Sequence, residues 1–257
     1  MKPFIRIGAL ISGTGTNLQA IIDSFNSGKI QGKVIFVGSD NAQAKGLTRA
    51  ETIGIPTFVV DYNRIIQEYK NYSEQAQLPN DFVLEDAFAK QSIYPKSTPR
   101  EKIEFFLKTR AIAECNLLKH MNSYSYDLIV LAGFMRKLSP YFIDHINSAS
   151  AIPRIMNIHP ALLPAFPGTD GYGDTYRYGC KIAGCTVHFV DYGEDSGPII
   201  AQRAFPILET DTLDSVKTKG LQLEWELYAE CIRLFSENRI QLVQKTHEKD
   251  RKSVIII

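Results

Sequence analysis

The stretch from Met156 to Pro164 reads MNIHPALLP and is followed by Phe166-Pro167-Gly168. Proline has no backbone N–H and a fixed φ, so neither a helix nor a central strand can continue through this stretch. Asn157 and His159 must therefore lie where a strand runs out into a rigid loop. Because they are two apart on extended backbone, their side chains point the same way. An amide and an imidazole placed like this are suited to holding a carbonyl oxygen as it becomes an oxyanion.

A second segment can deliver a carboxylate to the same place. Residues 187–198 read VHFVDYGEDSGP, which is typical of a strand that leaves into an acidic turn bounded by glycine. Asp195 lies in that turn, and we predict that it forms one catalytic site with Asn157 and His159. His188 lies in the middle of the strand and is interpreted as a packed or hydrogen-bonded core residue.

The N-terminal segment predicts a strand, a glycine-rich turn and a helix. Ile5–Ile11 is a mostly apolar run, residues 12–17 read SGTGTN, and apolar residues then recur at helical spacing from Leu18 to Phe25. Glycines let the backbone approach a ligand closely, and the N–H groups of a helix N-terminus favour an anion. A phosphate site and a plain strand-to-helix turn both remain open. The motif is neither the G-x-G-x-x-G dinucleotide pattern nor the Gly-Lys-Ser/Thr loop of triphosphate sites.

The rest of the chain alternates apolar runs with helical patterns. Strands are predicted at 33–38, 56–60, 126–132, 155–158, 183–190 and 198–206. Helices are predicted from a cap at Ser39-Asp40-Asn41 to Ala50, from a Thr98 cap with Pro99 in the first turn, from Ser139-Pro140, and from Asp211 to Phe235. This alternation predicts βαβ units, and therefore an α/β, Rossmann-like, mostly parallel sheet with helices on both faces.

Two segments are expected to depart from that regular pattern. Residues 62–98 mix polar and aromatic residues with weak periodicity and are predicted to be an irregular or partly helical insertion in a single domain spanning 1–257. Packing and a lid over the active site are both open as roles for this insertion. Residues 168–174 read GTDGYGD and are predicted to be a glycine-rich loop. Residues 133–138 follow a buried strand and are a candidate pocket wall.

Composition excludes several classes of function. The net charge is +1, and the basic tail at 245–252 is interpreted as a solvated end, so counterion-driven nucleic-acid binding is not expected. The N-terminal apolar run is too short for a signal peptide or a membrane span. Four irregularly spaced cysteines indicate reduced thiols and a cytoplasmic location, and Cys180 and Cys185 are interpreted as packed residues rather than metal ligands. We expect small-molecule substrates and no nucleic-acid or membrane partner, and leave a homodimer open.

Four blocks in this order resemble the phosphoribosylglycinamide formyltransferase family, the folate-dependent enzymes of purine synthesis. They are ISGTGTNLQA at 11–20, LAGFMR at 131–136, NIHP at 157–160, and VHFV at 187–190 followed by Asp195-x-Gly197-Pro198. The resemblance runs from the first strand to the last helix, outside the insertion, and implies a formyltransferase-type fold. It implies transfer of a formyl group from the cosubstrate 10-formyltetrahydrofolate to the amine of glycinamide ribonucleotide, without a metal.

The resemblance also implies a role for each site residue. Asn157 and His159 hold the oxyanion, while Asp195, directly or through a water, takes the proton of the attacking amine and keeps His159 protonated. The ribonucleotide is implied to bind at Gly13, Thr14, Gly15, Thr16, Asn17, Arg100 and Glu224, with Arg64 as a rival for Arg100. The folate is implied to bind at Met135, Arg136, Leu138, Ile143 and Asp191.

One departure from the family and several alternatives qualify this hypothesis. Family members usually carry a His shortly after the Pro-Gly of residues 164–168, where this chain has Asp170. A formyltetrahydrofolate deformylase would use the same trio with water, but that family carries an extra N-terminal domain. A formyltransferase acting on another amine is also open. From other classes, the imperfect glycine pattern argues against a dinucleotide-dependent oxidoreductase, and the intact trio argues against a non-catalytic nucleotide-binding module.

Overall fold

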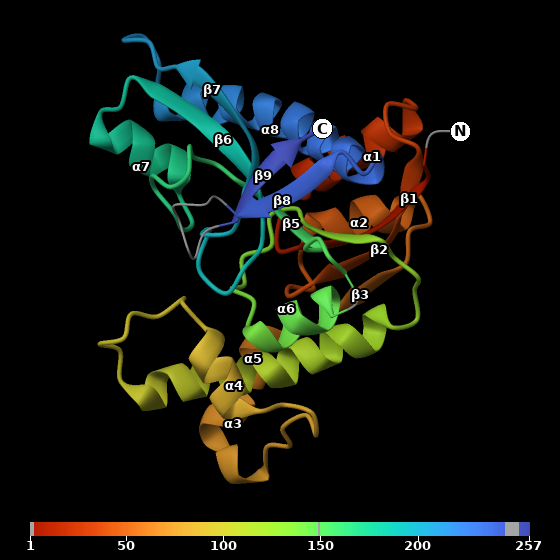
Figure 1. Cartoon of the computed structure of the whole chain (residues 1–257), viewed down its shortest axis with the longest axis vertical. Helices are drawn as coiled ribbons and strands as arrows, with labels where there is room; N and C mark the ends of the chain where they lie inside the picture. Colours follow the sequence, from red (N-terminus) through yellow and green to blue (C-terminus); the bar gives the residue numbers. More distant parts are fainter. Residues whose placement is uncertain (1–2, 149, 245–251) are drawn as a thin grey trace.

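A mostly parallel sheet forms the centre of the molecule (Figure 1). The computed structural model describes residues 3–148, 150–244 and 252–257. Within these residues the sheet has seven strands in the order β3-β2-β1-β4-β5-β6-β7. Their bounds are Ile5–Ile11 (β1), Gly32–Ser39 (β2), Thr57–Val59 (β3), Leu128–Leu131 (β4), Ile155–His159 (β5), Ile182–Phe189 (β6) and Ile199–Pro206 (β7). Strands β1 to β5 pair in parallel, whereas β6 pairs antiparallel with both β5 and β7. The predicted α/β fold is confirmed.

Helices cover both faces of this sheet, as predicted. One layer contains α1 (Thr16–Asn26), α2 (Lys45–Thr52) and α8 (Leu213–Ser236), and the other contains α5 (Arg100–Met121) and α6 (Pro140–Asn147). Strand β4 is buried between the two layers, so both of its faces are apolar. A strand of this kind is stable only when helices remove both faces from water, which explains the three-layer arrangement.

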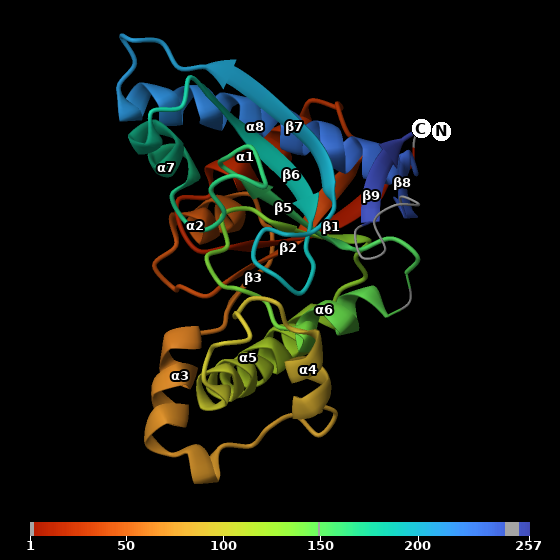
Figure 2. The same ribbon diagram turned by 60° about the vertical axis from the view of Figure 1, so that its left-hand side comes forward.

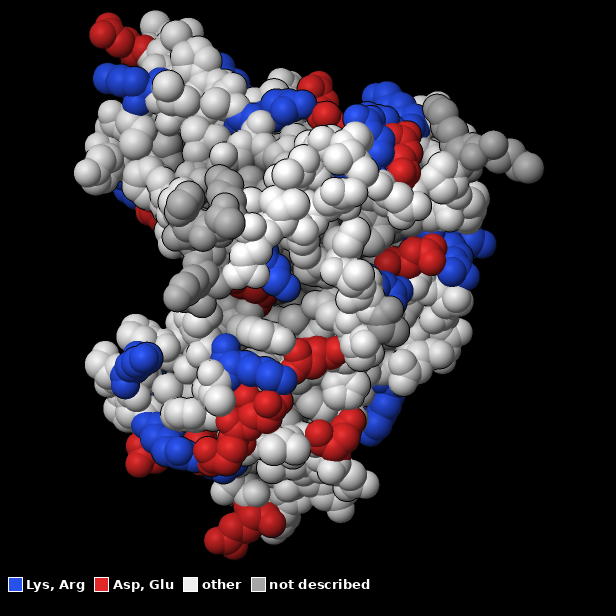
Figure 3. Space-filling model, viewed as in Figure 1, with Lys and Arg blue, Asp and Glu red and all other residues white. Residues whose placement is uncertain are grey.

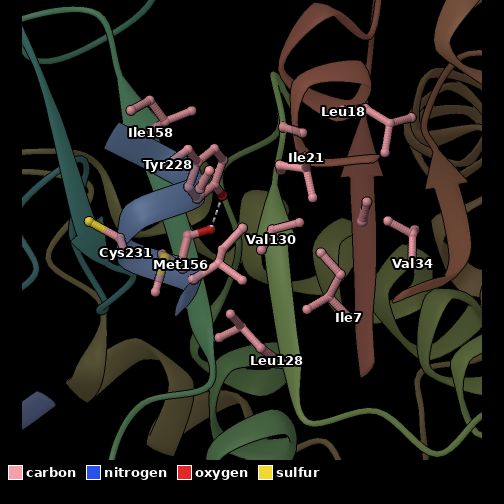
Figure 4. Close-up of a cluster of buried hydrophobic side chains, with 14 of the residues drawn as sticks. Ile7, Leu18, Ile21, Val34, Leu128, Val130, Met156, Ile158, Tyr228 and Cys231 are labelled. Carbon is pink, nitrogen blue, oxygen red and sulfur yellow. Dashed lines mark hydrogen bonds between the residues drawn. The ribbon is translucent and has the colours of Figure 1, made fainter. Parts of the chain in front are cut away.

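The side chains of β4 divide between the two hydrophobic cores. Leu128 and Val130 join the core under α1 and α8, and Ile129 and Leu131 join the core under α5 and α6, because successive side chains of a strand point to opposite faces. Figure 4 shows the first of these cores, with Tyr228 of α8 lying over β5. The buried Tyr228 hydroxyl donates a hydrogen bond of 2.8 Å to the backbone carbonyl of Met156, so it satisfies its polar atom and ties α8 to the sheet.

Residues 62–98 form a partly helical lobe beside α5, away from the sheet (Figures 1 and 2). The lobe contains α3 (Tyr62–Asn71), the 3₁₀ turn η1 (Ser73–Gln75) and α4 (Leu84–Lys90). It has a small core of its own, in which Ala87 packs on the buried side of α5. On the face shown in Figure 3, acidic and basic side chains are interspersed over this lobe, so this face does not present a strong field of one sign. These helices lie within the residues that the sequence predicts to be an irregular or partly helical insertion.

Two predicted helix starts were wrong. Helix α2 begins at Lys45, with Ala44 in the N-cap position and no side-chain cap. Ser39-Asp40-Asn41 instead leads into a turn, in which the Asn41 side chain accepts from the Gln43 N–H at 2.9 Å. Helix α5 begins at Arg100 after an N-cap at Pro99, so Thr98 does not cap it. Short polar side chains form local turns as readily as they cap helices, and this explains the first error.

The C-terminal half also departs from prediction in two places. Part of the expected glycine-rich loop is helix α7, which spans Gly171–Tyr178. After α8 the chain forms an antiparallel hairpin of β8 (Ile240–Gln244) and β9 (Lys252–Ile256), which the sequence did not predict. Most of the basic tail predicted to be a solvated end, residues 245–251, lies outside the described residues. Within the described part of the chain, no helix combines the length and apolar character needed to cross a membrane.

Candidate active site

A cleft with a volume of about 420 Å³ opens at the carboxyl ends of the parallel strands. The loops after β1 and β4 meet there, where the strand order reverses, which is the usual ligand position in open α/β sheets. These two loops are tied together, because the Ser12 N–H donates to the Gly133 carbonyl at 3.0 Å and the Met135 N–H donates to the Ser12 hydroxyl at 2.8 Å. The cleft is therefore a pre-formed part of the fold.

The predicted catalytic residues come together in this cleft. Asn157 and His159 lie at the end of β5, and Asp195 comes from the turn after β6. The Asp195 Oδ2 atom lies 3.2 Å from His159 Nδ1 and accepts from the Gly168 N–H at 2.9 Å. The other ring nitrogen of His159, Nε2, lies 2.8 Å from the carbonyl oxygen of Phe166. The loop that contains Phe166 and Gly168 thus fixes both side chains, one from the end of β5 and one from the turn after β6.

The contacts of His159 favour a doubly protonated ring. Both of its nitrogens face oxygens that only accept, a carboxylate and a carbonyl, so each nitrogen carries a hydrogen. The Asp195 side chain is only 13% exposed. Burial acts to raise the pKa of Asp195, but the neighbouring rings of His188 and His159 and the Gly168 N–H outweigh burial and hold that pKa below its usual value. The site therefore contains an ion pair in a nearly dry position.

His188 lies in the site rather than in the hydrophobic core. It is buried, with 2% of its surface exposed, and lies directly across from Asn157 in the β5–β6 pairing. Its Nε2 atom lies 3.2 Å from Asn157 Nδ2 and 3.6 Å from Asp195 Oδ1. The interpretation of His188 as hydrogen-bonded is confirmed, but the residues that it contacts are catalytic candidates. Only the register between the two strands could have revealed these contacts.

The cleft has a polar end next to α1 and α8. Asn17 Nδ2 donates to Glu224 Oε2 at 2.8 Å, and Tyr172 of α7 lies against the same pocket. Three oxygens gathered there, Asn17 Oδ1, Glu224 Oε1 and the Tyr172 hydroxyl, are buried without a partner among the described residues. Burial raises the pKa of the Glu224 carboxyl. Buried polar atoms rarely lack partners in native proteins, so this end is suited to a ligand that carries hydroxyl groups.

The glycine-rich turn lies at the N-terminus of α1 beside this polar end. Its carbonyl groups are occupied, since Gly13 O accepts from the Gly46 N–H at 3.1 Å and Thr14 O accepts from Arg49 Nε at 3.0 Å. Gly15 precedes the helix with φ of 71°, and a Cβ there would come within 2.6 Å of the Gly46 Cα. Thr16 begins the helix. With no side-chain cap, the first N–H groups of α1 are left for water or an anion.

The opposite wall of the cleft contains four of the five predicted folate contacts: Met135, Arg136, Leu138 and Asp191. Arg136 forms an ion pair with the buried Asp40 and donates to Asn63 Oδ1 at 3.0 Å. Asp191 shapes the turn after β6 by accepting from the Gly193 N–H at 3.1 Å and the Ser196 hydroxyl at 2.6 Å. The polar residues of this wall are thus held by hydrogen bonds and ion pairs within the protein, next to the apolar side chains of Met135 and Leu138.

The structure does not bring Arg100, Arg64 or Ile143 to this cleft. Arg100 is half exposed at the start of α5, where its guanidinium pairs with Glu85 and Glu104, and Arg64 pairs with Glu68 within α3. Both arginines are thus neutralised within or beside the lobe. Ile143 is buried in α6 and borders a neighbouring cavity instead.

Residue 170, where the family usually has His, carries a carboxylate that is already paired. Asp170 lines the cleft beside Lys217 of α8, a pocket residue that the sequence analysis missed. Asp170 Oδ2 accepts from Arg177 at 2.7 Å, its Oδ1 lies 3.5 Å from the Lys217 ammonium, and the bond with Arg177 holds the pKa of Asp170 low. No group of three His, Cys, Asp or Glu residues in the described ranges is arranged to hold a metal ion. Cys185 is buried and Cys180 half-buried, both as free thiols.

The chain is similar to known formyl transferases in sequence and in structure. The family model described as formyl transferase matches residues 5–232. A phosphoribosylglycinamide formyltransferase from Haemophilus influenzae is 32% identical over 249 residues, which cover 97% of this chain and 95% of the relative. The solved structure of glycinamide ribonucleotide transformylase 1 from Symbiobacterium toebii is 37% identical, with a TM-score of 0.70 over 99% of this chain and 94% of that one. That of phosphoribosylglycinamide formyltransferase from Coxiella burnetii, in complex with CHES, is 31% identical, with a TM-score of 0.71 over 93% of this chain and 90% of that one.

Proposed function

The chain belongs to the formyl transferase family, and from this premise we propose that it transfers a formyl group from 10-formyltetrahydrofolate to the amine of glycinamide ribonucleotide, in de novo purine synthesis. The observation that carries the proposal is the pair of His159 and Asp195, 3.2 Å apart in the same cleft as Asn157. The same cleft has a polar end and an apolar wall, which match a sugar phosphate and a pterin. The similar proteins from Haemophilus influenzae and Symbiobacterium toebii are named for this reaction.

The ribonucleotide fits the polar end of the cleft. The uncapped N-terminus of α1 favours the phosphate group, and the glycines at 13 and 15 allow a close approach. The unpartnered oxygens of Asn17, Tyr172 and Glu224 fit the ribose hydroxyls, which both donate and accept. Lys217 also lines the cleft, where its ammonium lies 3.5 Å from the Asp170 carboxylate. Arg100 and Arg64 have no part in this assignment.

The folate fits the opposite wall, between the loop after β4 and the turn after β6. Leu138 and Val190 offer apolar surface, and Met135 is largely exposed beside them. The Lys137 ammonium lies 2.5 Å from a carboxylate oxygen of Glu194, which joins the two loops at the rim. A flat ring system between these loops would be enclosed on both faces.

The side chains supply what an attacking amine requires. Bound folate supplies the formyl group and leaves with a proton on N10. As the amine forms its bond to the formyl carbon, charge develops on the formyl oxygen, and the N–H groups of His159 and Asn157 stabilise it. His159 Nε2 currently donates to the Phe166 carbonyl, so we infer that the formyl oxygen takes the position of that carbonyl. Asp195 keeps His159 charged and takes up the proton of the ammonium, directly or through a water, and this proton passes to N10 as the bond between N10 and the formyl carbon breaks.

The test is an assay of folate absorbance with purified protein and 10-formyltetrahydrofolate, with and without glycinamide ribonucleotide. We expect turnover only when the ribonucleotide is present, and none with the Asp195→Asn variant as a blank. Equal turnover without the ribonucleotide would identify a deformylase. Turnover with a different amine in place of the ribonucleotide would identify a formyltransferase of other specificity. Binding of the ribonucleotide without any turnover would identify a non-catalytic module.

The setting of the enzyme is proposed on the same basis. A cytoplasmic location fits the four cysteines, because all of them are free thiols; two of them are buried. Small molecules are the proposed substrates, and no metal enters the mechanism. The sequence leaves open whether the protein forms a homodimer, and sedimentation of the purified protein would measure its oligomeric state.

A further inference from the structure

His188 has a fixed tautomer in this structure. Its Nδ1 atom lies 2.8 Å from the backbone carbonyl oxygen of Phe189, which can only accept, so Nδ1 carries a hydrogen. The other nitrogen, Nε2, points to the catalytic cluster, 3.2 Å from Asn157 Nδ2 and 3.6 Å from Asp195 Oδ1. What Nε2 does there depends on whether it also carries a hydrogen.

The charges around His188 favour a neutral ring. Among the described residues, Asp195 is the only carboxylate paired with it, and this carboxylate already faces Nδ1 of His159, whose two nitrogens both lie next to acceptor oxygens. One negative charge is thus matched by one positive charge. A second imidazolium in the same nearly dry position would be unpaired, and unpaired buried charges are strongly unfavourable. The lone pair of His188 Nε2 is therefore available to accept from the Asn157 amide.

We propose that His188 is a positioning residue for catalysis, which holds the Asn157 amide so that its NH₂ group, rather than its carbonyl, serves the oxyanion. One amide hydrogen is bound by His188 Nε2, and the second hydrogen on the same nitrogen is left for the formyl oxygen. Within the described residues, this is the one hydrogen bond found for the Asn157 side chain. Without it the amide can turn over and present an oxygen, which would repel the developing negative charge.

The strand pairing explains why His188 can do this. Asn157 and His188 are direct neighbours across the antiparallel β5–β6 pair, where side chains on one face lie close enough to interact. The Phe189 carbonyl then fixes the ring by binding Nδ1, on the side away from Asn157. The kinetic part of this inference rests on the proposed function, whereas the tautomer of His188 can be tested without it.

The kinetic test compares His188→Gln with His188→Asn. The carbonyl oxygen of a glutamine can reach the position of Nε2, whereas an asparagine extends only as far as Nδ1 and leaves Asn157 unbound. We expect His188→Asn to lower kcat by about 10- to 100-fold, less than the roughly 100- to 1000-fold for losing an oxyanion donor outright. KM for both substrates should change by less than about threefold, and His188→Gln should recover most of kcat. Equal losses in both variants would overturn the proposal.

Two further measurements separate positioning from a structural role. In a double-mutant cycle, Asn157→Ala with His188→Asn should be no slower than Asn157→Ala alone, whereas additive losses would contradict the proposal. Nitrogen-15 spectra of the wild-type protein should show His188 neutral, with the hydrogen on Nδ1. A hydrogen on Nε2 would overturn the assignment even if every variant misfolds. If the wild-type protein fails to formylate glycinamide ribonucleotide, the proposed function fails, while these spectra still decide the role of His188.

Discussion

A buried acid beneath the proposed folate wall offers a quantitative test of the structure. Glu114 of α5 is fully buried and accepts from both the N–H of Ser139, at 2.8 Å, and the Ser139 hydroxyl. Ser139 precedes α6 and follows Leu138, which lines the cleft. Burial raises the pKa of Glu114 from 4.5 to about 8, although the bonds from Ser139 and the charge of Arg110 act to lower it. The folded protein therefore retains a proton there at neutral pH.

The sign and size of the effect follow from proton linkage. Between about pH 4.5 and pH 8 the unfolded chain has lost the Glu114 proton while the folded chain keeps it, so the free energy of unfolding falls as pH rises. Each unit of pKa difference corresponds to about 1.4 kcal/mol, which makes the loss about 3 kcal/mol by pH 7. Below pH 4.5 both states hold the proton, and the effect disappears.

Glu114→Gln removes this titration and keeps the hydrogen bonds, since its carbonyl can accept from the Ser139 N–H and its NH₂ can donate to the Ser139 hydroxyl. We expect the variant to gain stability relative to wild type as pH rises from 5 to 8, by about 3 kcal/mol, measured by urea unfolding at each pH. Glu101→Gln, an exposed change on the same helix, is the control and should show no such trend. A stability difference for Glu114→Gln that stays constant with pH would refute the reasoning.

Three further predictions concern the cleft itself. His159→Ala and Asp195→Asn should each lower kcat by about 100- to 10,000-fold while the protein stays folded, and near-wild-type turnover in both would contradict the proposed roles. Glu224→Ala should raise KM for the ribonucleotide by about tenfold and leave KM for the folate unchanged, because a hydrogen-bond partner at the polar end is lost; equal effects on both KM values would count against that placement. Gly15→Ala should lower the unfolding free energy by about 1 to 3 kcal/mol, and by more than Gly28→Ala, since both glycines have φ near 70° but only Gly15 faces a backbone contact. Equal losses would show that the contact is unimportant.

The sheet was predictable because its central strands are apolar on both faces. The run at 126–132 predicted a buried parallel strand, and β4 spans Leu128–Leu131 between two helical layers. The long helix α8 was also predicted, because apolar residues recur along it at helical spacing. In both cases the burial that stabilises the element leaves a regular apolar pattern in the residues themselves.

The short elements were less predictable because their stability comes from distant contacts. Helix α7 spans only eight residues and contains two glycines, and it is held by packing against α8 and β6. The sequence analysis placed Arg100 at the cleft, and the structure places it elsewhere for a similar reason. Its partner Glu85 belongs to α4, in the insertion, and only the folded lobe shows that this arginine is neutralised there instead of at the cleft.

The candidate catalytic residues also differ in how far the sequence could predict them. Asn157 and His159 were predictable because they lie two apart on one strand, a local relation that prolines make rigid. The pairing of Asn157 with His188 depends instead on the register between β5 and β6. A slip of one residue in that register would turn His188 to the opposite face of the sheet, so the amide would lose its acceptor without any change in sequence near it. The residues proposed to touch the substrate are therefore marked in the local sequence, whereas the residue proposed to orient one of them is selected by the fold.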